Sequence, residues 1–145
     1  MRAAWSRLAV VVALTAALAA ADADDGAREA ATAFGRALLS GTAQALRPVL
    51  PDHGRVHLTL ARLGPEEGSF GARQVEAVFL DFLARGKVDS FEVKRCEGDG
   101  RRSALTHATA TITDRDGRSG RIGLYLRFES EGERWVLREV KETAE

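Results

Sequence analysis

The sequence has little that could cross-link the fold or attract a charged polymer. Its 145 residues include one cysteine, Cys96, and equal numbers of basic and acidic side chains, 21 of each. A lone cysteine cannot form an intramolecular disulfide, so packing alone must stabilise the fold. A chain without net charge has no bulk attraction for nucleic acid or acidic lipid. We therefore expect no nucleic-acid partner.

Long apolar runs are also missing, except near the N-terminus. The run Leu8–Ala20 follows two arginines and is shorter than the roughly 20 residues that a membrane-spanning helix needs. This pattern is typical of a cleavable secretory signal, although a retained anchor is the competing reading. Small residues suited to cleavage follow at Ala19, Ala21 and Ala23. We expect a signal peptide over 1–23, an exported (periplasmic or secreted) protein, and one domain over 24–145 without a membrane span.

The clearest secondary-structure signal is a strand at Arg121–Glu129. Every second side chain in this stretch is apolar, and the residues between them are mostly polar. This period of two predicts a strand that is buried on one face. The apolar set is Ile122, Leu124, Leu126 and Phe128. Turn-rich segments on both sides predict that the neighbouring strands join it as hairpins.

Helical patterns occupy the first half of the chain, and strand patterns occupy the second. Apolar residues at spacings of three and four predict helices over 26–40, 43–49 and 71–85. Alternation predicts one strand over 56–60 and four more over 91–96, 104–113, 121–129 and 134–140. The segment Ala61–Gly68 reads as an exposed loop. The order predicts an α+β fold.

This order of elements resembles the nuclear transport factor 2-like superfamily, the α+β cone fold. The segment 37–46 looks like the first helix bend of that superfamily, and 132–138 looks like its last hairpin. The stretches 68–74, 81–83 and 90–93 are similar to a branch of exported bacterial proteins of unknown function. The resemblance implies a cone-shaped, curved antiparallel sheet covered by three N-terminal helices.

Some members of the superfamily are isomerases or dehydratases. The resemblance implies that an isomerase would carry a tyrosine on the first helix, a carboxylate near the first strand and a second carboxylic acid on a central strand. Here the first helix offers Phe34 and Leu38, and the inward residues of both strands are apolar. We therefore expect no catalytic residue, no cofactor and no enzyme. A cone-fold isomerase, dehydratase or hydrolase is the alternative.

The resemblance also implies that the mouth of the cone can hold a small apolar ligand. The expected lining is Phe34, Leu58, Phe82, Leu124, Leu126, Trp135 and Glu139. A hairpin turning at Glu131–Gly132 would pair Leu124 with Glu139 and place this carboxylate on the apolar face. A register shift of one residue would place it in solvent. A protein partner is the other candidate for a binding function.

The three histidines, His53, His57 and His107, are scattered along the chain, so we expect no metal site. Relatives with the cone fold commonly dimerise through the outer face of the sheet. The outer residues expected here are Thr109, Thr111, Tyr125, Arg127, Val136 and Val140. They suit a partly polar homodimer interface, and they equally suit a solvated sheet.

Overall fold

The computed structural model describes residues 25–64, 67–98 and 102–145. The expected signal peptide and its cleavage sites lie outside these ranges. Within them, no helix has both the length and the apolar character needed to cross a membrane.

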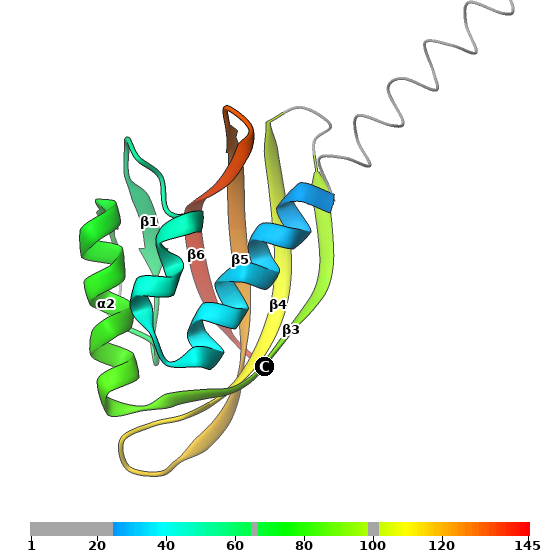
Figure 1. Cartoon of the computed structure of the whole chain (residues 1–145). Helices are drawn as coiled ribbons and strands as arrows, with labels where there is room; N and C mark the ends of the chain where they lie inside the picture. The colour runs from blue at the N-terminus through cyan, green and yellow to red at the C-terminus, as the bar shows by residue number, and fades with distance from the viewer. Residues whose placement is uncertain (1–24, 65–66, 99–101) are drawn as a thin grey trace, which may run out of the picture.

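Three helical segments lie on one side of a curved sheet (Figure 1). The first, which we call the N-terminal helix, covers residues 25–40 of the described chain. It is followed by the 3-10 helix η1 (Ala43–Val49) and, later, by α2 (Ala72–Arg85). The three expected helices are therefore confirmed. Gly41, with φ of +73°, ends the first of them, because glycine enters this left-handed region without a steric cost.

The sheet has six strands in the spatial order β2-β1-β6-β5-β4-β3. The strands are β1 (Val56–Thr59), β2 (Glu67–Phe70), β3 (Lys87–Gly98), β4 (Ser103–Thr113), β5 (Ser119–Glu131) and β6 (Arg134–Ala144). Four of the five neighbouring pairs are antiparallel, whereas β1 runs parallel to β6. The α+β cone fold is confirmed, with the correction that its sheet is mixed.

The prediction of an exposed loop over Ala61–Gly68 was wrong at the C-terminal end of that segment, because β2 begins there. This strand pairs with β1 through contacts such as Val56 with Phe70 and Leu58 with Gly68. None of its four residues is buried, so it carries no apolar alternation that would predict a strand. β2 is therefore defined by its pairing with β1 and not by the burial of its side chains.

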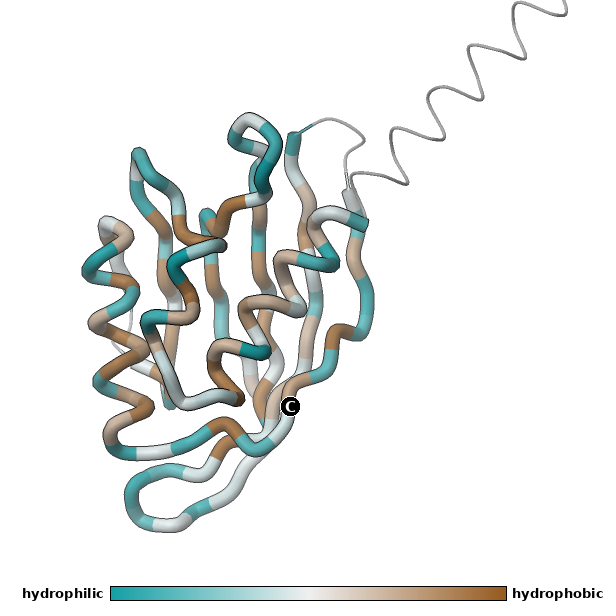
Figure 2. Tube along the Cα trace, in the orientation of Figure 1, coloured by the Kyte–Doolittle hydropathy of each residue, from teal (hydrophilic) through white to brown (hydrophobic). Residues whose placement is uncertain are grey.

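The core lies between the helices and the concave face of the sheet. Figure 2 shows hydrophobic residues along the helices and the strands that face them. Phe34 of the N-terminal helix meets Phe79 of α2 edge to face, with ring centroids 5.7 Å apart. Both rings are fully buried in one continuous apolar cluster. Aromatic contacts of this kind add to the free energy gained from burial alone.

The N-terminal helix approaches the sheet closely because it carries glycines at two contact points. A β-carbon at Gly35 would overlap the ring of Phe91 on β3, and one at Gly26 would overlap the indole of Trp135 on β6. The helix can therefore rest directly on both aromatic rings.

We predict that Phe82→Ala lowers the free energy of unfolding by about 3 to 5 kcal/mol, because it empties a large site in the core. Phe82 is only 5% exposed, whereas Leu80 on the same helix is 58% exposed. Leu80→Ala is the matched control and should change the stability by less than about 0.5 kcal/mol. Chemical denaturation checks both values, and equal effects of the two variants would contradict the proposed packing of α2.

Candidate functional site

The pairing of β5 with β6 decides which side chains face the cone. Phe128 pairs with Leu137 and Leu126 pairs with Val140, so Arg138 is an extra residue on β6. A bulge of this kind reverses which face the following residues occupy. The expected register, with Phe128 opposite Trp135 and Leu124 opposite Glu139, was therefore wrong.

Two residues change faces because of this bulge. Glu139 lies opposite Arg127 and His57 on the outer face of the sheet, away from the cone, and it is half-buried. Val140, which was expected on the outer face, is fully buried opposite Leu126. Val136 stays on the outer face, opposite Glu129, yet it is also fully buried.

Glu142 takes the position that the sequence analysis gave to Glu139, opposite Leu124. Its carboxylate accepts backbone N–H bonds from Ala61, Arg62 and Leu63 at 2.9 to 3.0 Å. Both carboxylate oxygens are occupied by these amides, which fix the loop after β1. Sequence reasoning missed this role because the last strand was expected to end at Val140.

The expected cone lining forms a filled core. Phe34, Leu58, Leu124 and Leu126 are 0% exposed, so none of these side chains is in contact with solvent. These four side chains belong to one cluster with Phe82, against which Trp135 packs from the edge. The structure thus brings six of the seven expected residues together, and it excludes only Glu139.

Few polar side chains reach this core within the described ranges. The buried polar residues of these ranges are Thr106 and Thr109, of which only Thr106 faces the core, since Thr109 lies opposite Gly123 on the outer face. The Thr106 hydroxyl faces the cone from β4 and donates a hydrogen bond to Cys96 Sγ at 3.4 Å. Neither hydroxyl is an efficient acid or base near neutral pH.

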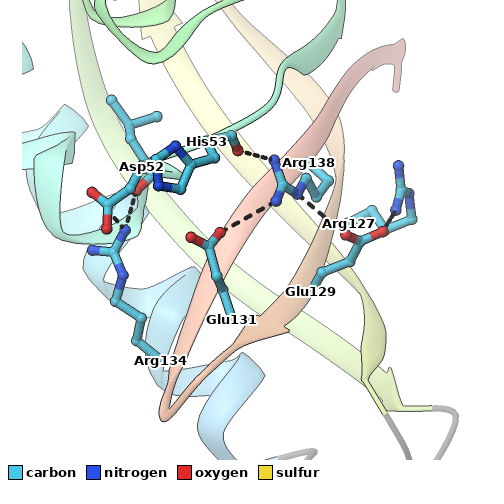
Figure 3. A network of polar contacts seen from close by, with 8 residues as sticks. Asp52, His53, Arg127, Glu129, Glu131, Arg134 and Arg138 are labelled. Carbon is cyan, nitrogen blue, oxygen red and sulfur yellow. Dashed lines mark hydrogen bonds and ion pairs between the residues drawn. The ribbon is translucent and has the colours of Figure 1, made fainter.

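A polar network joins the hairpin of β5 and β6 to the segment before β1 (Figure 3). The bulged Arg138 contacts Glu129 Oε2 and Glu131 Oε2 at 3.2 Å each, and donates to the His53 carbonyl at 2.9 Å. Arg134 donates to the Leu50 carbonyl at 2.7 Å. These contacts hold residues 48–53 in place.

The outer face of the sheet carries an aromatic pair at its centre. His107 on β4 stacks on Tyr125 on β5, with ring centroids 4.7 Å apart and an interplanar angle of 17°. Leu105, two residues earlier on the same face, is 40% exposed. We call Leu105, His107, Tyr125 and Arg127 the outer patch. Sequence reasoning found Tyr125 and Arg127 but missed the other two, because His107 and Leu105 alternate with small residues of the core.

A groove of about 710 Å³ opens on the helical side, between η1 and α2. Leu50, Pro51 and the exposed Leu80 form part of its wall, together with charged residues from both helices. No signal in the sequence pointed to it, since it depends on how two helices distant in the chain pack together.

One histidine gains a carboxylate neighbour that the sequence did not reveal. His57 Nε2 lies 3.3 Å from Glu67 Oε1, and its Nδ1 lies 3.5 Å from Ser69 Oγ, because β2 pairs with β1. Across the described ranges, no group of three or more histidine, cysteine or acidic residues is placed to hold a metal ion.

Solved structures share this architecture. A candidate dehydratase of the NTF2-like family from Streptomyces avermitilis has a TM-score of 0.67 at 17% identity, over 87% of this chain and 98% of that one. A DUF4783 family protein from Bacteroides uniformis has a TM-score of 0.63 at 18% identity, covering 79% and 95% of the two chains. A ketosteroid isomerase-like protein from Erwinia carotovora atroseptica has a TM-score of 0.64 at 15% identity, covering 82% and 93%.

No protein-family model and no curated protein matches the chain. At identities below 20%, the structural neighbours establish the fold and leave the activity open. The chain therefore has the NTF2-like α+β cone fold, as its resemblance implied, and its neighbours include an uncharacterised bacterial branch.

We predict that Glu142→Ala lowers the free energy of unfolding by about 1.5 to 3 kcal/mol, because backbone amides then lose a charged acceptor. Glu139→Ala, on the same strand, is the matched control and should cost less than about 0.5 kcal/mol. Thermal unfolding at neutral pH measures both. An unchanged melting temperature for Glu142→Ala would show that the loop does not depend on this carboxylate.

Proposed function

We propose that this chain is an exported, non-catalytic binding domain whose outer sheet face holds a protein partner, and that this partner is a second copy of the chain. The observation that carries the proposal is the stacked His107–Tyr125 pair at the centre of the outer patch. Aromatic rings and arginine are the side chains that most often anchor protein interfaces. Export rests on the N-terminal sequence pattern.

The charges beside the outer patch favour close apposition of two copies. Arg127 Nη1 lies 2.6 Å from Glu129 Oε1, and Arg138 Nε lies 3.2 Å from Glu129 Oε2. Arg138 Nη2 also lies 3.2 Å from Glu131 Oε2, so two carboxylates of the same chain balance the two arginines and the partner need not supply one. This reduces the like-charge repulsion that two copies of an arginine-bearing face would otherwise cause.

The filled cone supports a non-catalytic role. An acid or base inside the cone would have to be free to meet a substrate, whereas the Glu142 carboxylate is held by three backbone amides. The fully buried Leu124 and Leu126 leave no room for a ligand between them. Binding at the surface therefore requires less rearrangement than binding in the cone.

We predict that the mature protein sediments as a dimer at micromolar concentration and that Tyr125→Glu converts it to a monomer, because the variant removes the aromatic anchor and an ionised carboxylate is costly to desolvate in an interface. Leu39→Glu is the control, since Leu39 is 46% exposed on the helical side. This variant should remain a dimer. Sedimentation equilibrium gives the answer.

A monomeric wild-type protein would contradict the proposal. A dimer that survives Tyr125→Glu would place the interface elsewhere. Circular dichroism of each variant must match the wild type, so that a loss of the dimer is not a loss of the fold.

A further inference from the structure

The groove is lined by residues of η1 and α2 and of the segment after η1. Both helices lie on the helical side of the sheet (Figure 1). Its volume, about 710 Å³, falls within the roughly 300 to 1,000 Å³ of small-molecule sites. Leu80 is the most exposed large apolar side chain of the described residues, at 58%. A groove with this wall offers an apolar surface that no described element covers.

Most charges around the groove are already paired. Arg47 and Glu76 both line the groove and form a two-pronged pair, with Nε–Oε2 at 3.0 Å and Nη2–Oε1 at 3.1 Å. The hydrogen bond with Glu76 raises the pKa of Arg47 above its ordinary value, so the guanidinium keeps its charge. Asp52 Oδ1 lies 3.5 Å from Arg134 Nη2. These pairs leave the groove with no net charge of their own.

Arg73 is the exception. It lines the groove, is exposed, and makes no ion pair or hydrogen bond with the described residues. It also stands in the first turn of α2, which contains no acidic residue. The partial positive charge at the start of a helix disfavours a cation there. The stability of α2 therefore gives no reason for an arginine at this position. The binding of an anion would give one.

We propose that this groove binds a small carboxylate with an apolar tail, of the medium-chain alkanoate class. The planar guanidinium of Arg73 matches a carboxylate and can donate two parallel hydrogen bonds to it. The tail then lies along Leu50, Pro51 and Leu80, which removes their exposed surface from water. The fixed Arg47–Glu76 pair borders the site and contributes no net charge to it.

Isothermal titration of the mature protein with decanoate, below its micellar concentration, tests the proposal. We expect saturable one-to-one binding that weakens at least tenfold in Arg73→Gln. Arg36→Gln, which removes an exposed arginine of the N-terminal helix, should bind as the wild type does. Decanol, which has the tail without the carboxylate, should bind at least tenfold more weakly than decanoate.

The melting temperature of Arg73→Gln without ligand should equal or exceed that of the wild type, because the variant removes a cation from the start of α2. Binding that is absent at millimolar decanoate, or unchanged in Arg73→Gln, would overturn the proposal. A peptide with a free C-terminal leucine that binds more tightly than decanoate would instead assign the groove to a protein terminus. Tyr125→Glu should bind decanoate as the wild type does. A failure of the proposed dimer can then be distinguished from a failure of decanoate binding.

Discussion

The structure depends on how completely the helices fill the concave face of the sheet. Phe34 and Phe79 meet over the sheet, and Leu58, Leu124 and Leu126 close the space beneath them with no exposed surface. Interiors packed in this way have no room for a ligand unless a side chain moves. The filled core stabilises a chain that has no disulfide, and for this reason we propose binding at two outer surfaces, the outer patch and the groove.

The bulge at Arg138 connects these two surfaces. It turns Val140 and Glu142 toward the core and leaves Glu139 outside. It also frees Arg138 to bind Glu129 beside the outer patch and the His53 carbonyl in the segment that continues into the groove wall. One extra residue in β6 therefore decides which of the last residues of this strand face the core. It also places Arg138 where it balances the charge of Glu129 and holds the segment after η1.

The sequence predicted the elements better than their pairing. Alternation and helical spacing located three helices and five strands, because burial on one face leaves a periodic pattern in the chain. The bulge, the parallel pairing of β1 with β6 and the short strand β2 leave no such pattern, since they depend on contacts between distant segments. For the same reason the apolar cone residues were found, whereas Glu142, His107 and the groove were not.

The cone of this protein is closed, and we propose that small ligands bind outside it. A titration with decanoate, followed by NMR of isotope-labelled leucine methyl groups, tests this directly, because the core and the groove carry different leucines. We predict that the methyl signals of Leu50 and Leu80 shift and saturate, while those of Leu124 and Leu126 stay in place. Saturable shifts of Leu124 and Leu126, with none at Leu80, would show that the cone opens to bind the ligand and would contradict the claim.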